Sequence, residues 1–165
     1  DVIISIKGVQ RYENADTDTM ELVTAGRLER EGNSYTLSYQ ESELTGLEGT
    51  LTTFQIEPER ITLMRVGEFN SQMVFQEGRR HMSMYNTPYG AMTIGVNTRH
   101  LLAELDDQGG EIEIDYAIEI DHSVAGRNTF QINVKEAEGA ASGQLRFDLL
   151  TMDQLSPDRQ GQARW

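Results

Sequence analysis

The sequence predicts an all-β protein, an antiparallel and mostly up-and-down closed β-barrel of about 8–10 strands. Apolar and polar side chains alternate with a period of two through most of residues 2–136, as they do in strands with one buried face. Glycine, proline and asparagine separate the alternating segments at the spacing typical of sandwiches and barrels. The 165-residue chain is long enough for one domain with a sizeable core.

The strands can be placed in order along the chain. Residues 111–121 give the clearest pattern, with apolar side chains at even positions and mostly acidic ones at odd positions. Other strands are expected around the following apolar positions: Val2, Ile4 and Ile6; Met20, Leu22 and Leu28; Tyr35, Leu37 and Tyr39; Leu51, Phe54 and Ile56; Ile61 and Leu63; Met73 and Phe75; Met82 and Met84; Met92, Ile94 and Val96; Phe130, Ile132 and Val134.

Two segments are less regular. The spacing of Leu51 and Phe54 breaks the alternation and predicts a β-bulge. Residues 98–105 fit either a helix or a strand, and the alternation of Leu101, Ala103 and Leu105 favours the strand.

Short turns connect only neighbouring strands, so the predicted strands form a meander, and closing that meander removes its exposed edges. The barrel is expected to occupy residues 1–136. A Gly/Ala/Ser-rich linker follows at 137–143, and residues 144–155 could form a short amphipathic helix or an extra strand. Residues 137–165 are therefore expected to lie outside the core as a linker and tail.

Charge and composition exclude several functions. The chain has 27 acidic and 14 basic residues, a net charge of −13, which disfavours nucleic acid and anionic membranes as partners. Cysteine is absent, so disulfides, thiolate catalysis and cysteine-bound metals are excluded. No apolar run approaches the ~20 residues of a membrane helix, and no signal peptide is recognised.

The sequence lacks the common catalytic and metal-binding motifs, so we expect a protein that is not an enzyme and needs no cofactor. Phosphate-binding glycine loops, HExxH and nucleophile-elbow motifs are all missing from the sequence. His81, His100 and His122 are far apart along the chain, without the local spacing of metal ligands. The carboxylates of residues 111–121 share one strand face and are expected to form a solvated outer wall.

Four segments together resemble a known family. Residues 37–41 (LSYQE), 63–67 (LMRVG), 85–90 (YNTPYG) and 110–116 (GEIEIDY) occur in the order and spacing of the YwiB-like family. These are small bacterial proteins of unknown function, mostly from Firmicutes, with a calycin-like (lipocalin-like) β-barrel. The resemblance covers about residues 2–136 and implies this fold and a cytoplasmic setting; it offers no catalytic residues.

Arg65 is the most informative single residue. Ile61 and Leu63 alternate inward, which places Arg65 on the same face. A guanidinium inside a barrel needs a partner because an isolated buried charge is costly. Three positions are open: a rim position in water, an internal ion pair with Glu41, or an anchor for the acid group of a ligand.

The leading hypothesis is a barrel that binds a small, partly apolar or acidic ligand. Arg65 would be its polar anchor, and methionine suits a wall that accommodates varied apolar partners, although core packing is its commoner role. The expected interior ligand-binding residues are Tyr35, Tyr39, Arg65, Met82, Met84 and Tyr116. The alternative is an interaction module that contacts a protein, or a second copy of the chain as a homodimer, through its outer surface and tail.

Overall fold

The computed structural model describes residues 1–12, 17–43, 47–68, 70–121 and 123–137. The expected linker and tail, apart from Ala137, lie outside the described residues. The first five strands are β1 (Val2–Tyr12), β2 (Thr17–Glu31), β3 (Ser34–Gln40), β4 (Leu51–Ile56) and β5 (Ile61–Val66). The other five are β6 (Ser71–Phe75), β7 (Arg80–Thr87), β8 (Gly90–Asp106), β9 (Gly109–Ile120) and β10 (Ser123–Glu136).

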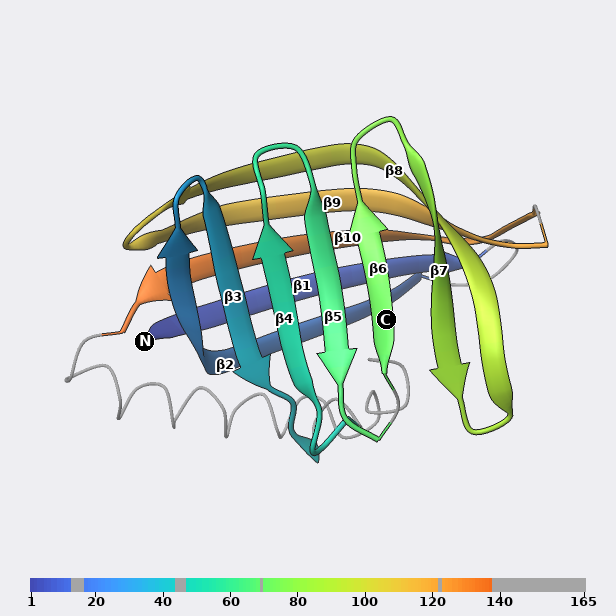
Figure 1. The fold of residues 1–165 in the computed structure, drawn as a ribbon, viewed down its shortest axis with the longest axis horizontal. Helices are drawn as coiled ribbons and strands as arrows, with labels where there is room; N and C mark the ends of the chain where they lie inside the picture. Colours follow the sequence, from blue (N-terminus) through green and yellow to red (C-terminus); the bar gives the residue numbers. More distant parts are fainter. Residues whose placement is uncertain (13–16, 44–46, 69, 122, 138–165) are drawn as a thin grey trace.

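The described residues form one closed antiparallel barrel, which confirms the predicted fold class. Each strand pairs with its neighbours in the sequence, and β1 closes the meander by pairing with β10. Figure 1 shows two layers whose strands cross: β3–β6 in front, and the long strands β1, β9 and β10 behind them. None of the described segments is an apolar helix long enough to cross a lipid bilayer.

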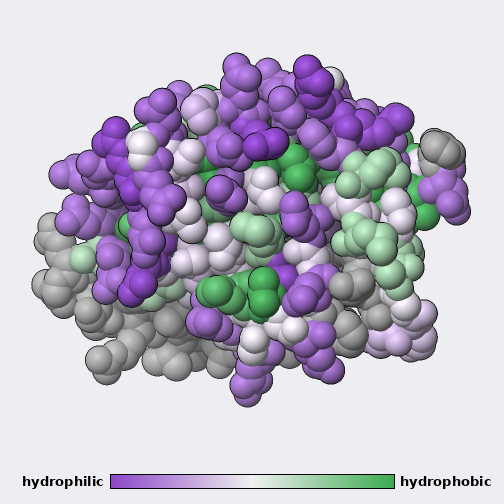
Figure 2. Space-filling view, viewed as in Figure 1, coloured by the Kyte–Doolittle hydropathy of each residue, from purple (hydrophilic) through white to green (hydrophobic). Residues whose placement is uncertain are grey.

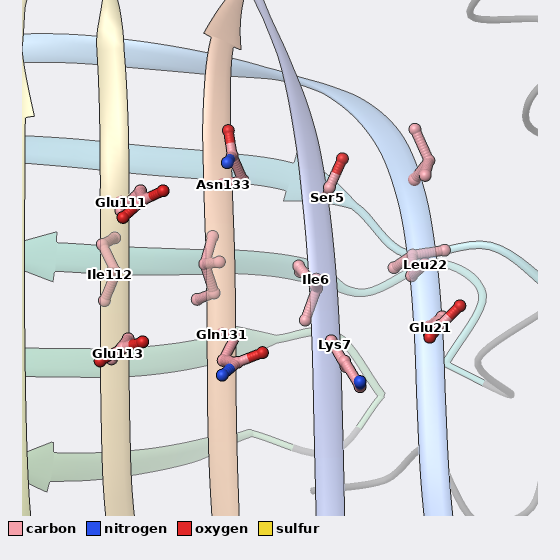
Figure 3. Close-up of a pocket in the computed structure, with 12 residues that line it drawn as sticks. Ser5, Ile6, Lys7, Glu21, Leu22, Glu111, Ile112, Glu113, Gln131 and Asn133 are labelled. Carbon is pink, nitrogen blue, oxygen red and sulfur yellow. The ribbon is translucent and has the colours of Figure 1, made fainter.

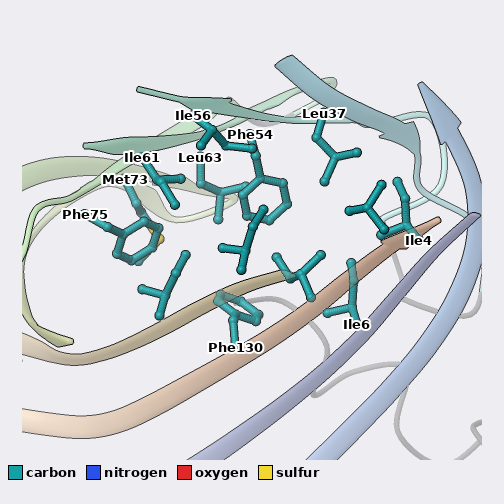
Figure 4. Close-up of a cluster of buried hydrophobic side chains, with 14 of the residues drawn as sticks. Ile4, Ile6, Leu37, Phe54, Ile56, Ile61, Leu63, Met73, Phe75 and Phe130 are labelled. Carbon is teal, nitrogen blue, oxygen red and sulfur yellow. The ribbon is translucent and has the colours of Figure 1, made fainter. Parts of the chain in front are cut away.

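Alternation along the strands fills the barrel with apolar side chains. Successive residues point in and out, so each strand contributes every second side chain to the interior. The core extends from Ile4 and Ile6 to the rings of Phe75 and Phe130 (Figure 4). Its largest fully buried members are Tyr116, Phe54, Phe75, Ile4, Leu37, Ile61, Leu63, Met73, Ile112, Ile114 and Ile132.

The two irregular segments resolve in different ways. The prediction of a bulge in β4 is wrong, because β4 pairs residue by residue with both β3 and β5. Leu51 is exposed, and Thr52 is the residue that points inward. The strand favoured for residues 98–105 is confirmed as part of β8, which carries an irregularity between Thr98 and His100.

The junction of β6 and β7 is the weakest part of the barrel wall. Among the described residues these strands form one ladder pair, Ser71 with Tyr85, whereas β4 and β5 are paired along their whole length. The β6–β7 turn is bonded instead to β8, through Gly78 and Arg79 to Thr98. We call this junction the β6–β7 seam.

The outer acidic wall is confirmed except at Glu119. Glu119 is buried, and its carboxylate accepts from Arg80, with Nε 2.8 Å from Oε1. The two residues come from β9 and β7, on either side of β8, where Gly95 leaves room above the sheet for their side chains. The ion pair therefore ties β7 to β9 across the outside of β8.

Candidate functional site

A row of polar side chains closes one end of the interior. The strand register aligns Tyr39, Thr52, Arg65 and Ser71 across β3, β4, β5 and β6. Two residues further along each strand, the same register aligns Leu37, Phe54, Leu63 and Met73. The barrel interior thus changes within one step of the alternation from an apolar core to a polar row.

The polar row includes a buried carboxylate. Glu41 follows β3 and is buried, and its backbone N–H donates to the carbonyl of Thr50 at 2.8 Å. The Thr52 hydroxyl donates to Glu41 Oε2 at 2.5 Å, and the Tyr39 hydroxyl is also bonded to Glu41. Short hydrogen bonds from hydroxyls are the contacts that stabilise a carboxylate away from water.

Arg65 lies inside the barrel beside this carboxylate network. Its side chain is 8% exposed, and its positive charge acts on the Tyr39 hydroxyl. Among the described residues, Arg65 Nε and Thr98 Oγ1 are the buried side-chain atoms without a hydrogen-bond partner. An unpaired buried donor is costly, so Arg65 Nε marks a place where a hydrogen-bond acceptor would be stabilised.

Tyr39 stays neutral at physiological pH. Burial raises the pKa of its hydroxyl far above the ordinary value, and the nearby Glu41 charge raises it further, while Arg65 opposes the shift. A neutral Tyr39 is a hydrogen-bond donor to Glu41. Tyr39 is thus an uncharged hydroxyl on which the charges of both Glu41 and Arg65 act.

A second polar group lies inside the opposite wall. Gln10, Asn128, Tyr116 and Thr98 are aligned across β1, β10, β9 and β8, and all four are buried. Asn128 Nδ2 donates to the Tyr116 hydroxyl at 3.2 Å. The Thr98 hydroxyl, on a residue 1% exposed, is the second buried atom without a partner.

The structure separates the six expected ligand-binding residues. Tyr39 and Arg65 lie together in the polar row. Tyr116 is inside but packs its ring on Phe75, with centroids 4.7 Å apart, so it belongs to the core. Tyr35 is half-buried at the other end of β3, where Arg30 lies over its ring at 5.9 Å.

The expected interior position of Met82 and Met84 is wrong. These side chains are 63% and 59% exposed on the outside of β7, and it is Ser83 that is buried between them. The alternation of β7 is real, but hydropathy assigns its inward face to the methionines, whereas the inward residue is the polar Ser83. Hydropathy predicts the inward face of a strand correctly only where that part of the barrel interior is lined by apolar side chains.

Sequence reasoning found Arg65 and its neighbour Glu41 but missed Thr52, Thr98 and Asn128. Threonine is common in strands on either face, so Thr52 gave no signal of its own. Strict alternation places residues 52, 54 and 56 on one face of β4, so Phe54 and Ile56 would have indicated that Thr52 points inward. The bulge expected between Leu51 and Phe54 assumes a break in this alternation, so it hides the inward position of Thr52.

The described surface also has a groove on the outside of the barrel. It encloses 380 Å³ over β9, β10, β1 and β2, with Lys7 flanked by Glu21 and Gln131 and with Glu113 beyond Gln131 (Figure 3). Its charged side chains are exposed or half-buried and lie in water on the solvent side of the sheet. The interior, by contrast, holds a buried charged donor without a described partner, Arg65 Nε, so we place the candidate site there.

The histidines in the described part of the chain do not form a metal site. His81 is bonded to Gln76 at 3.0 Å, and His100 lies between Glu77 and Glu113 near the outer surface. Within the described ranges, no cluster of three His, Asp or Glu side chains could hold a metal ion. The polar row itself combines one cation, one carboxylate and hydroxyl groups, which suits binding through hydrogen bonds.

Fold and site together define a small antiparallel β-barrel with an apolar core and a buried, charged polar row at one end. The chain belongs to the family described as "Domain of unknown function (DUF1934)", whose model matches residues 4–132. Its fold is similar to that in "Crystal structure of ywiB protein from Bacillus subtilis", with a TM-score of 0.73 and 20% sequence identity. That similarity covers 83% of this chain and 92% of the other. No curated protein matches the sequence.

Proposed function

We propose that this barrel binds a small, partly apolar ligand at the polar end of its interior. The observation that carries the proposal is the buried Arg65 Nε, a donor without a partner among the described residues. Barrels of about eight strands have room for side chains or one small ligand, and a few placed polar groups give such sites their specificity.

The position of the polar row supports a ligand with one polar and one apolar part. Arg65, Tyr39 and Thr52 would meet the polar part, and Leu63 and Phe54 lie one step deeper in the interior. An Arg that is largely buried gains from a ligand that supplies an acceptor, because the donor is already removed from water.

A ligand screen tests the proposal. The full chain is heated with short alcohols, amides, carboxylic acids and small aromatic compounds, and native mass spectrometry counts bound molecules. We expect at least one class to raise the midpoint of unfolding and to appear as a one-to-one complex. A screen in which no compound shifts the midpoint or forms a complex contradicts ligand binding.

A second candidate is an interaction module that uses the outside of β7. Met82 and Met84 are exposed there, and pale green apolar side chains gather over this strand in Figure 2. Exposed apolar patches often mark contact surfaces, and methionine adapts to varied partners. Light scattering after size exclusion tests self-association: a dimer that dissociates in Met82→Lys/Met84→Lys supports it, and a monomer at all concentrations argues against it.

A further inference from the structure

We infer that the ligand of the polar row is a short-chain monocarboxylate held by the Arg65 guanidinium. This inference rests on the proposed function and adds the chemical class of the ligand. The carboxylate of the ligand would lie at the Nε edge of Arg65. Its short apolar chain would lie against the adjacent apolar row, which includes Phe54 and Leu63.

The hydrogen bonds of the row leave Arg65 Nε without an acceptor. Glu41 is a buried carboxylate beside this row, and it accepts hydrogen bonds from the hydroxyls of Thr52 and Tyr39. Arg65 Nε keeps a buried N–H that no described residue accepts. A carboxylate can accept from Nε and a terminal nitrogen of the guanidinium together, which makes it the best match for this edge.

The charges of the site favour a singly charged anion over a doubly charged one. Arg65 supplies one positive charge, and Glu41 is a carboxylate in the same buried row. A phosphate monoester with nearly two negative charges would be repelled more strongly by Glu41 than a carboxylate. The net charge of −13 acts in the same direction.

The packing of the core favours a short chain. Leu63 and Phe54, the inward neighbours of Arg65 and Thr52 along their strands, are both 2% exposed and belong to the continuous core. Extra methylene groups forced into a packed core are destabilising. We therefore expect affinity to rise over the first few carbon atoms and then to fall.

Tyr39, Thr52 and Glu41 act as positioning residues. The carboxylate of Glu41 is fixed by the two hydroxyls, and its charge and that of Arg65 both act on the Tyr39 hydroxyl. Its attraction holds Arg65 at the polar row without occupying Nε. Glu41→Gln should therefore weaken carboxylate binding less than loss of Arg65 does.

The test compares butyrate with a neutral isostere, butyramide, and with a phosphate monoester. Butyrate, butyramide and propyl phosphate are titrated into the ¹⁵N-labelled full chain, and dissociation constants are taken from amide shifts in β3–β6. We expect butyrate to bind at least tenfold more tightly than butyramide or propyl phosphate. Arg65→Gln should remove the preference over butyramide, and Arg30→Gln, which changes an exposed arginine, should keep it.

Each outcome decides a different point. Equal affinity for butyrate and butyramide, or a preference that survives Arg65→Gln, overturns the carboxylate assignment and leaves ligand binding standing. If none of the three compounds moves the resonances, while the wider screen also finds no ligand, the proposed function itself fails. Arg65→Lys, which keeps the charge but lacks Nε, replaces the glutamine variant if that variant does not fold.

Discussion

Thr52 donates a hydrogen bond of 2.5 Å to Glu41, and both side chains are buried at the end of the barrel. The bond joins β4 to the residue that follows β3, next to the ladder pair of Thr52 with Arg65. A buried carboxylate is stable only when its oxygens are bonded. The threonine hydroxyl is therefore part of what holds a charged group inside an otherwise apolar barrel.

Replacement of that hydroxyl should be costly. Thr52→Val keeps the shape of the side chain but removes a donor to Glu41, so the free energy of unfolding should fall by about 1–3 kcal/mol. Urea denaturation at pH 7 measures the change. Thr53→Val is the matched control on the opposite face of β4, and it should change the stability by less than ~0.5 kcal/mol. Equal effects of the two variants would contradict the role of Thr52.

Stability at high pH should report on Tyr39. Its pKa is raised in the folded state, so the folded protein keeps the proton when the unfolded chain loses it near the ordinary value of about 10. The stabilisation is complete below that pH and is lost above it, by up to about 1.4 kcal/mol per pH unit. Tyr39→Phe should make the decline shallower by this slope, as measured by denaturation between pH 9 and 11.

The control for that measurement is Tyr89→Phe, because the Tyr89 side chain is 99% exposed. Its decline with pH should match that of the unsubstituted protein. A Tyr39→Phe variant with the same decline as Tyr89→Phe would show that the Tyr39 hydroxyl ionises in the folded state as readily as in the unfolded state.

The methionines test the phase of β7. Met73 is fully buried, so Met73→Ala should lower the free energy of unfolding by about 2–5 kcal/mol. Met82→Ala and Met84→Ala change exposed side chains on the outside of the barrel and should each cost less than about 1 kcal/mol. Thermal or urea unfolding distinguishes the two groups, and a large loss in Met84→Ala would place that side chain inside.

Most of the fold was predictable because one physical rule covers it. Where the interior is apolar, a period of two identifies both the strand and its inward face, as in residues 111–121. Short turns then restrict the topology to a meander, and closure follows from the cost of free edges. The same alternation placed Arg65 on the inward face of β5, since it continues the face of Ile61 and Leu63, but it left open whether the guanidinium lies at the rim.

The rule fails where the interior is polar. Ser83 and Thr52 point inward although both are polar. Hydropathy therefore assigns β7 the wrong inward face around Ser83, and it predicts a bulge near Thr52 that the strand does not have. The choice among rim, ion pair and ligand anchor for Arg65 depends on which atoms reach Nε. That depends on contacts between strands, which the local pattern does not contain.

The β6–β7 seam should be the first part of the barrel to open. With one ladder pair between these strands, β6 has fewer backbone bonds to break than β4 or β5. Native-state hydrogen exchange should therefore be faster in peptides that cover residues 71–75 than in those that cover residues 51–56. Equal protection of the two strands would mean that the seam is as stable as the rest of the wall.

The most direct test of the account is the exchange rate of the Arg65 Nε proton, observed by ¹⁵N NMR and assigned through its loss in Arg65→Lys. If the guanidinium lies inside the barrel with a donor ready for a ligand, this proton exchanges with water much more slowly than that of the exposed Arg27, and its resonance moves when butyrate is added. Exchange as fast as at Arg27, with a resonance indifferent to butyrate, would place Arg65 in solvent and contradict the account.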